Sequence, residues 1–388
     1  MKCHIFTVDE EITMKVEPFL VEQFMNSFEK SARLNLAETC VDPFTLREFL
    51  DFVGESDFLT NLGNMKLTYG SIEGSEDLRA GLANLYSSLE SRNILVCGGA
   101  IGANFLVFYT LVEPGDTVVS VFPAYQQLYS VAKSFGANVK LLPLREKNSW
   151  LPDINELSDL LDDKTKLIVI NNPHNPTGSL IESDLLGEIC ALAERRGIYI
   201  LSDESYRGLF VDPTAFAPSA VDLSENAIAT GSFSKPFSLA GLRLGWIAAK
   251  KEIIEECMLH RDYTTISQSM IADALASIAV KHVEKIFARS IGILRANHSI
   301  MSRWIKEEAS MSWIPPKGGS SAFLRYSFNM SSKKLCLQLL KQKSVLVVPG
   351  YCFGTERFLR VGYGCKTDTL SAGLARFKDF LLTYGLSE

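Results

Sequence analysis

"GSFSKPFSLAGLRLGW", residues 231–246, surrounds a single lysine, Lys235, with serines and glycines and follows the apolar run "NAIAT". That run favours a strand, so the lysine is expected where the strand ends. Ser232 stands three residues before Lys235 and Arg243 eight residues after it, and these hydroxyl and guanidinium groups could grip a phosphate. The amine could form a Schiff base with an aldehyde. A lysine in an ordinary surface loop is the competing interpretation.

Short apolar runs alternate with helical patterns between about residues 76 and 250. Continuous apolar runs are typical of strands buried on both faces of a mainly parallel sheet with helices outside, and the predicted class is therefore α/β. In such sheets, ligands bind at the carboxyl ends of the strands. The runs are "DTVVSVF" (116–122), "KLIVINN" (166–172), "GIYILSD" (197–203), "AIATGSF" (227–233) and "LGWIAAK" (244–250), and the helical patterns include 183–197.

The two ends of the chain predict a second, smaller α+β domain. Apolar residues at helical spacing indicate an amphipathic helix over 12–31. The C-terminal third gives a long helical pattern, then strand and helix patterns at 321–328, 332–342, 344–350, 357–364 and 369–385. We therefore expect a large domain at 55–265, a small domain formed by 1–54 with 266–388, and a cleft between them.

Polar residues follow several of the predicted strands. "ILSDESYRG" ends an apolar run in Asp203 and continues to Tyr206. A buried aspartate is costly unless a cation or hydrogen-bond donors meet it. The competing interpretation is a helix cap. "VINNPHNPTG" carries Asn175 in a stretch that alone indicates only a turn.

Two further stretches offer groups for a planar, phosphorylated ligand. "LVCGGAIGANF" is a glycine-rich helix start in which the amides of Gly99, Ala100 and Ile101 could hold an anion. A lone glycine loop is weak support for such a site. "FPAY" offers Tyr125 as a stacking ring, although taken alone this motif favours an ordinary packed aromatic.

Composition excludes several classes of function. The 388 residues are 47% hydrophobic and 22% charged, and their net charge of −6 is mixed along the chain. We therefore expect no nucleic-acid partner and no membrane association. The eight cysteines show no metal-binding spacing, so we expect no metal site. We expect these cysteines to be reduced thiols in a cytoplasmic protein. The N-terminus is acidic too early for a signal peptide, and no apolar run is long enough to span a membrane.

Together these strand ends match the chemical handles of pyridoxal 5′-phosphate: phosphate, ring faces, pyridine nitrogen, phenolic oxygen and aldehyde. With "NPHNPTG", "SDESY" and "SFSKPFSLAGLRLGW", the chain resembles the fold type I pyridoxal-phosphate enzymes, specifically the class I/II aminotransferases. The resemblance extends from about residue 68 to 360. The roles it implies are Lys235 bonded to the aldehyde, Asp203 at the pyridine nitrogen, Tyr206 and Asn175 at the phenolic oxygen, Ser232, Arg243, Gly99, Ala100 and Ile101 at the phosphate, and Tyr125 on the ring.

The resemblance also implies shared sites and a substrate grip. Tyr69 in "TYGSIEG" matches a tyrosine that reaches the neighbouring subunit's phosphate, which implies a homodimer. Arg360 in "RVGYG" matches the arginine that takes the substrate α-carboxylate, with Asn175 and Ala37 beside the substrate. Glu38 could face a cationic substrate end, and an ordinary loop glutamate is the alternative.

The implied activity is transfer of an amino group between an L-amino acid and a 2-oxo acid. Relatives with the same cofactor catalyse β-elimination, oxidation or hydroxylation of arginine-like amino acids, or cyclisation, and fold does not decide between these reactions. A cofactor-binding regulator is a further alternative, although no basic helix-turn-helix extension is visible.

Overall fold

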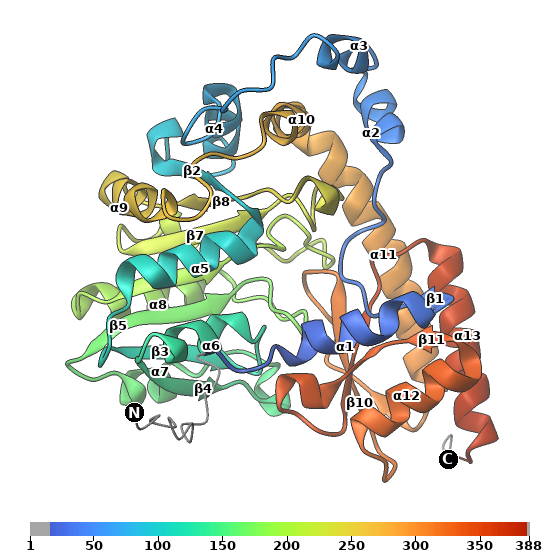
Figure 1. Cartoon of the computed structure of the whole chain (residues 1–388). Coiled ribbons are helices and arrows are strands. Elements are labelled where there is room, and N and C mark those ends of the chain that lie inside the picture. Colours follow the sequence, from blue (N-terminus) through green and yellow to red (C-terminus); the bar gives the residue numbers. More distant parts are fainter. Residues whose placement is uncertain (1–15, 386–388) are drawn as a thin grey trace, which may run out of the picture.

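A seven-stranded sheet is the central layer of one half of the computed structural model, which describes residues 16–385 (Figure 1). The strand order is β2-β8-β7-β6-β5-β3-β4; β8 runs antiparallel to β2 and β7, and the other pairs are parallel. The predicted, mainly parallel sheet is confirmed. The strands are β2 (Ile94–Cys97), β3 (Thr117–Phe122), β4 (Asn138–Pro143), β5 (Thr165–Asn171), β6 (Tyr199–Asp203), β7 (Ala227–Ser232) and β8 (Gly245–Ala248).

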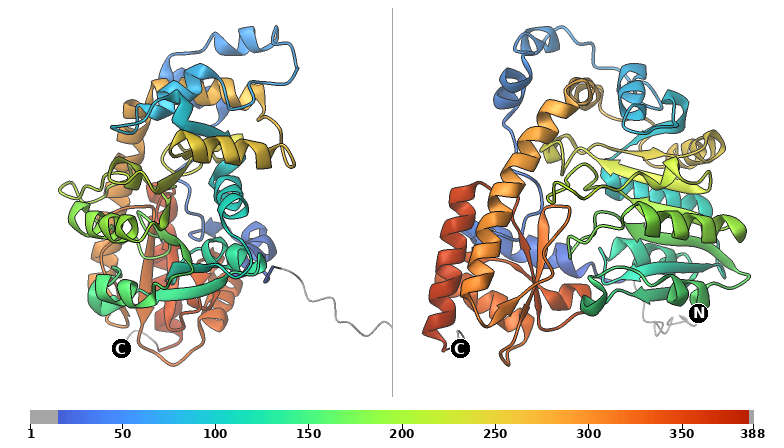
Figure 2. Two further views of the ribbon diagram at one scale, coloured as in Figure 1. Left: turned by 90° about the vertical axis from the view of Figure 1, so that its left-hand side faces the viewer. Right: turned by 180° about the vertical axis from the view of Figure 1, so that it is seen from behind.

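Helices cover both faces of this sheet, which explains its uninterrupted apolar strands (Figures 1 and 2). On one face α5 (Gly99–Leu111) and α6 (Gln127–Ser134) pack on the strands, and on the other lie α7 (Ile154–Leu160) and α8 (Ser183–Arg195). The predicted helix 183–197 is α8. Two more helices flank this layer, namely α4 (Glu76–Ala83) beside β2 and α9 (Lys251–Arg261) beside α5.

A smaller four-stranded antiparallel sheet lies in the C-terminal part of the chain, in the order β12-β13-β10-β9. Its strands are β9 (Met311–Ser312), β10 (Ser321–Tyr326), β12 (Val348–Pro349) and β13 (Phe358–Gly362). The accompanying helices are α10 (Met270–Lys281), α11 (Val283–Glu307), α12 (Ser332–Lys343) and α13 (Thr367–Thr383). Because α10 packs against α4, the C-terminal part also contacts the region of the large sheet.

The N-terminal segment joins the C-terminal part. Strand β1 (Leu34–Asn35) pairs in parallel with β11 (Val345–Leu346), and α1 (Leu20–Phe28) packs beside β12. The chain then crosses to α2 (Leu46–Val53) and α3 (Phe58–Leu62). The division into domains at 55 and 265 remains a prediction.

Two predicted elements differ in the structure. The expected helix 12–31 begins only at Leu20, because Pro18 cannot donate a backbone hydrogen bond and Phe19 is extended; residues 12–15 lie outside the described residues. It ends at Phe28 and tightens into a 3-10 turn over Glu29–Ser31. The single strand expected at 344–350 is two short strands, because β11 pairs with β1 whereas β12 pairs with β13.

Gly362, at the end of β13, lets two distant segments meet. Its amide donates to the Leu36 carbonyl oxygen at 2.7 Å, and a Cβ added there would lie 1.8 Å from the Glu38 carbonyl oxygen. Any side chain at this position would collide with backbone rather than with a flexible side chain. The glycine therefore fixes segment 36–38 against the strand that carries Arg360.

Replacing Gly362 with alanine should separate these segments and lower the free energy of unfolding by about 2–3 kcal/mol. Gly292→Ala, in the exposed interior of α11 with nothing within 4 Å of the added Cβ, is the control and should stabilise by up to about 1 kcal/mol. Urea unfolding curves measure both. Equal midpoints for the two variants would show that the close approach at Gly362 is unimportant.

Candidate active site

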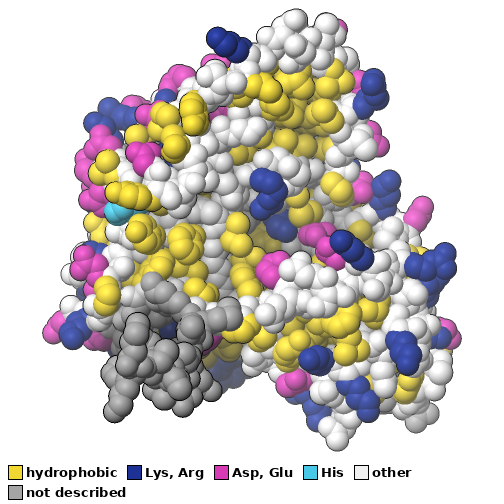
Figure 3. All heavy atoms as spheres, viewed as in Figure 1, with side chains coloured by type: hydrophobic (Ala, Val, Ile, Leu, Met, Phe, Trp, Pro, Cys, Tyr) yellow, Lys and Arg dark blue, Asp and Glu magenta, His cyan; other side chains and the backbone are white. Residues whose placement is uncertain are grey.

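A cavity of about 410 Å³ lies at the carboxyl ends of strands β5, β6 and β7 and extends to α1, segment 37–40 and Arg360 on β13. Its size suits a small molecule. On the face shown in Figure 3, basic and acidic side chains gather near the middle, beside α1. Of the predicted site residues, the cavity is lined by Ala37, Ala100, Ile101, Tyr125, Asn175, Asp203, Tyr206, Ser232, Lys235, Arg243 and Arg360.

Lys235 follows β7, and its side chain is 21% exposed. Its Nζ donates to the Thr39 Oγ1 at 2.9 Å and to the Cys40 Sγ at 3.4 Å, and lies 3.6 Å from the Glu38 Oε1. The amine thus ties the end of a central strand to a loop almost two hundred residues away in sequence. Thr39 and Cys40 were not predicted as site residues, because no local sequence pattern indicates a contact between segments so far apart in the chain.

The charges of Lys235 and Glu38 depend on each other. Burial alone would raise the pKa of Glu38, but the Lys235 charge and the amides of Cys40 and Thr39 outweigh it and lower that pKa to about 2. Burial alone would lower the pKa of Lys235, but Cys40, Tyr206 and Glu38 raise it above its ordinary value. In the described protein both side chains are therefore ionised at neutral pH.

Asp203, the last residue of β6, is buried and meets hydrogen-bond donors. Its Oδ2 accepts from the Asn104 Nδ2 at 2.8 Å, and its Oδ1 accepts from the Ser205 amide at 3.0 Å. Asn104 is itself fixed, because its Oδ1 accepts from the Thr230 hydroxyl at 2.6 Å. These bonds fix the orientation of the carboxyl group at the cavity. Asn104 stands in the quoted glycine-rich stretch but was not singled out there, since only the folded helix α5 points it at Asp203.

Arg360 is 4% exposed and carries an unused donor. Its Nη1 donates to the Asn175 Oδ1 at 3.2 Å and its Nη2 to the Ala37 carbonyl at 2.9 Å, but its Nε has no hydrogen-bond partner among the described residues. A buried donor left free is costly, so this group is expected to meet an anionic ligand.

Two further predicted residues, Tyr206 and Asn175, also line the cavity. The Tyr206 hydroxyl donates to the Thr39 Oγ1 at 3.0 Å. The Asn175 amide donates to the Asn171 Oδ1 at 2.7 Å, and Asn171, which was not predicted, anchors this loop to β6 through the Asp203 carbonyl.

The N-terminus of α5 forms another wall of the cavity. No side chain caps its first amides, and Ala100 and Ile101 line the cavity there. Gly99 does not line it but has a φ of +77°, and a Cβ added there would lie 3.2 Å from the Arg243 Nη2. Free amides, the guanidinium of Arg243 and the Ser232 hydroxyl together form an arrangement that suits a phosphate.

Helix α1 completes the cavity and was not part of the predicted site. The Tyr125 hydroxyl donates to the Glu22 Oε1 at 2.7 Å. Asn26 and Glu29 also line the cavity from this helix and the turn that follows it. A helix was predicted here, but the local pattern does not indicate which part of the molecule it would contact.

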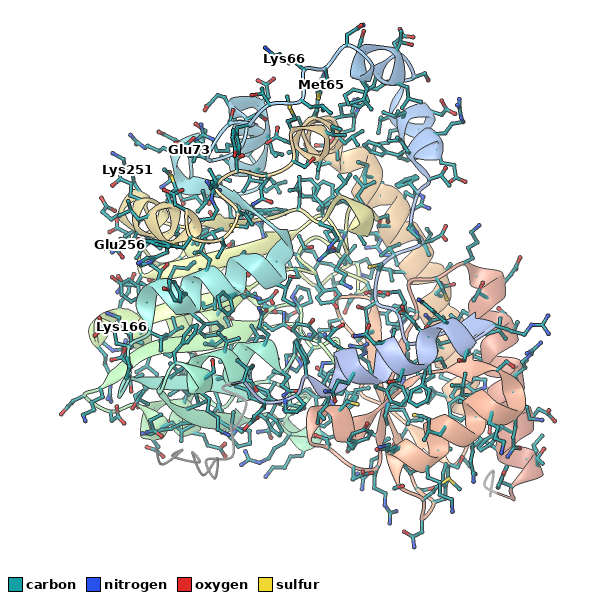
Figure 4. All side chains as sticks on the ribbon, viewed as in Figure 1. Met65, Lys66, Glu73, Lys166, Lys251 and Glu256 are labelled. Atoms are coloured by element: carbon teal, nitrogen blue, oxygen red, sulfur yellow. The ribbon has the colours of Figure 1, made fainter. Side chains whose placement is uncertain are left out.

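Tyr69, like Gly99, is a predicted residue that does not line the cavity. Its side chain is 76% exposed, and it lies by a separate surface hollow with Thr68, Gly70 and Gln268. Figure 4 labels Lys66 and Glu73, on either side of Tyr69 in sequence, near the upper edge of the molecule, well above α1. Any role for Tyr69 at a cavity of this kind would require a second copy of the chain.

The family described as Aminotransferase class I and II matches residues 46–377. The chain belongs to this family. Class I and II aminotransferases use pyridoxal 5′-phosphate, so the protein is a pyridoxal-phosphate-dependent transferase. The cavity fits that cofactor: it presents a lysine amine, a carboxylate held by amide donors, an uncapped helix N-terminus with a guanidinium, and a buried arginine with a free donor.

Three similar proteins show how this chain compares with individual proteins of known structure or name. The structure superimposes on that of a pyridoxal-phosphate-dependent aminotransferase from Streptococcus suis 89-1591 with a TM-score of 0.93, 39% identity and coverage of 96% and 99% of the two chains. Capreomycidine synthase from Streptomyces vinaceus is 33% identical over 80% of each chain. An aspartate aminotransferase from Pyrococcus horikoshii is 30% identical over 79% of this chain and 81% of its own.

Neither a membrane-spanning helix nor a metal-binding cluster is found in the described part of the chain. No helix within residues 16–385 is long and apolar enough to cross a membrane. The same part of the chain contains no group of three or more His, Cys, Asp or Glu side chains placed to hold a metal ion.

The Lys235–Glu38 pair predicts a specific pH dependence of stability. The pKa of Glu38 falls from its ordinary value of 4.5 to about 2 on folding, so its carboxylate stabilises the fold at neutral pH and this contribution is lost as the pH falls from about 5 towards 2. The difference in unfolding free energy between the wild type and Glu38→Gln should therefore shrink between pH 6 and pH 4, as measured by urea unfolding of the cofactor-free protein.

A Lys235→Met background provides the matched control. There the opposite charge is absent, so Glu38→Gln should change the pH dependence less. A difference that stays constant from pH 6 to pH 4, or that is the same in both backgrounds, would contradict the coupling between these two residues.

Proposed function

We propose that this family member transfers an amino group from an L-amino acid to a 2-oxo acid, with Lys235, Asp203 and Tyr206 as its catalytic residues. The observation that carries the proposal is that one cavity brings together the Lys235 amine, the Asp203 carboxylate held by Asn104, and the free Nε of Arg360. Asp203 ends β6, Lys235 follows β7 and Arg360 lies on β13, so groups far apart in the sequence converge on one space of ligand size.

The cofactor would be held by residues from five segments of the chain. Asp203 suits the pyridine nitrogen, because a fixed carboxylate favours a protonated ring nitrogen. Tyr206 and Asn175 suit the phenolic oxygen, and Tyr125 suits the ring face. Ser232, Arg243 and the amides of Gly99, Ala100 and Ile101 suit the phosphate.

When bound, pyridoxal 5′-phosphate supplies an aldehyde carbon that takes up the amino group and a ring that accepts the electron pair released at the substrate Cα. Arg360 would bind the substrate α-carboxylate through its free Nε and orient the Cα proton. The Lys235 amine would remove that proton as a general base. Glu38 lies 3.6 Å away and stabilises the ammonium form that results.

Two further features belong to this proposal. The chain would act as a homodimer, in which Tyr69 of one subunit reaches the phosphate site of the other; its 76% exposure in the single chain supports this assignment. The protein would work in the cytoplasm, which the free thiols of the cysteines between residues 16 and 385 support.

The fate of a labelled nitrogen tests the reaction. The cofactor-loaded protein is incubated with ¹⁵N-amino acids and either 2-oxoglutarate or pyruvate, and the products are identified by mass spectrometry. Transamination predicts ¹⁵N in the newly formed amino acid together with the 2-oxo acid of the donor. Release of ¹⁵N-ammonia, consumption of oxygen, or a cyclised product that keeps its nitrogen would replace transamination. The assay includes a cyclised product because capreomycidine synthase is among the similar proteins.

Lys235→Ala should lower turnover by about 10²–10⁴-fold or more, since it removes the base. Lys166→Ala is the control, because Lys166 lies at the start of β5, at the end of the strand opposite the cavity (Figure 4). Steady-state rates of the two variants in the same assay give the comparison. Wild-type turnover in Lys235→Ala would rule out the assigned role.

Tyr69→Phe should weaken cofactor retention although Tyr69 lies outside the cavity of its own chain. The reason is the loss of a hydroxyl donor to the partner's phosphate site. The cofactor dissociation constant, measured by dialysis, should rise severalfold, and sedimentation should show a dimer. A monomer, or an unchanged constant in the dimer, would contradict the shared site.

A further inference from the structure

The face that α1 turns to the cavity is acidic. Glu22, Met25, Asn26 and Glu29 all line the cavity, and their spacing of three, four and seven residues places them on one side of the helix and its final turn. Glu38 lines the same cavity a few residues later. Three carboxylates from residues 22–38 thus face the space where a substrate would lie.

The cations of the cavity do not neutralise this face. Lys235 lies beside Glu38, while Arg243 and Arg360 are assigned to the phosphate and the α-carboxylate. Glu22 accepts one hydrogen bond, from the Tyr125 hydroxyl, and Glu29 has no partner among the described residues. Both side chains are partly buried, and no basic side chain among the described residues forms an ion pair with either, so a cationic group that enters the cavity would be their first charged partner.

A second observation shows that the cavity is built for a ligand. Arg360 lines it, is 4% exposed, and has an Nε without a hydrogen-bond partner. The Arg360 Nε is complementary to an anionic group, and the carboxylates of Glu22 and Glu29 are complementary to a cationic group. A molecule that carries both a carboxylate and a cationic group can interact with Arg360 and with the acidic face of α1 at the same time.

We propose that the amino-acid substrate has a cationic side chain, ammonium or guanidinium, which Glu29 and Glu22 bind while Arg360 holds its α-carboxylate. The inference rests on the proposed function and names the substrate class of the same site. An acidic side chain would meet two like charges and be rejected, and a neutral one would leave them unpaired.

Matched pairs of substrates test this inference. Arginine and citrulline have nearly the same shape but differ in charge, as do lysine and norleucine. With the cofactor-loaded enzyme and one 2-oxo acid, kcat/KM should be about tenfold or more higher for the charged member of at least one pair, because a hydrogen bond to a charged group is lost in the other.

Three variants locate the effect. Glu29→Gln and Glu22→Gln keep the size of the side chain and remove its charge, and each should shrink the ratio of charged to neutral substrate by severalfold. Glu188→Gln removes the same charge from the exposed side of α8, on the other face of the large sheet, and should leave the ratio unchanged. An equal kcat/KM for both members of each pair, or a preference for glutamate, would overturn the inference while transamination stood.

Binding without turnover separates this inference from the proposed function. The cofactor-loaded Lys235→Ala variant is dialysed against radiolabelled arginine and citrulline. Tighter binding of arginine that disappears when Glu29→Gln is added supports the cationic subsite even if the first assay yields no 2-oxo acid. Equal binding of the two amino acids overturns it.

Discussion

A partly buried amine held between two distant parts of the chain is the constraint on which the rest of the site depends. The Lys235 Nζ lies at the end of a central strand, donates to Thr39 and Cys40, and faces the carboxylate of Glu38. A charge in this position is tolerated because hydrogen bonds and an opposite charge meet it. The N-terminal segment, itself fixed by β1 and by the close approach at Gly362, therefore closes over the strand ends.

The same arrangement divides the cavity into regions of different charge. Amides of α5 and Arg243 make one region suited to a phosphate, and Asp203 with its Asn104 partner makes a second that favours a cationic ring nitrogen. Arg360 offers a third to a carboxylate, and the acidic face of α1 a fourth. A zwitterionic substrate with one additional positive charge can satisfy the last two at once. The electrostatics of the walls thus select among the many substrates that one fold can accept.

Much of this site could be predicted from sequence because parallel strands deliver their carboxyl ends to one edge of a sheet. Asp203, Asn175, Ser232 and Lys235 follow apolar runs that could be read directly, and the structure brings them to one cavity. The predicted sheet is confirmed for the same reason, since strands covered on both faces leave a continuous apolar signal. The edge strand β4 was not singled out, because only one of its six residues is buried and its run is correspondingly mixed.

Contacts between segments that are distant in the chain could not be predicted from the sequence. Asn104 meets Asp203 and Thr39 meets Lys235 only after folding, and neither pair leaves a local pattern. Helix α1 was expected, but its start depends on Pro18. A role for its acidic face can be inferred only once the structure shows that this face lines the cavity. The split of strand 344–350 likewise follows from two different pairing partners.

The most direct test of the central assignment is to find where the cofactor attaches. The protein is loaded with pyridoxal 5′-phosphate, reduced with borohydride to fix any imine bond, digested, and sequenced by mass spectrometry. The account predicts the added phosphopyridoxyl mass on the peptide that contains Lys235, and its loss in Lys235→Arg. The mass on a different lysine, or no covalent attachment in a protein that retains the cofactor, would contradict the account.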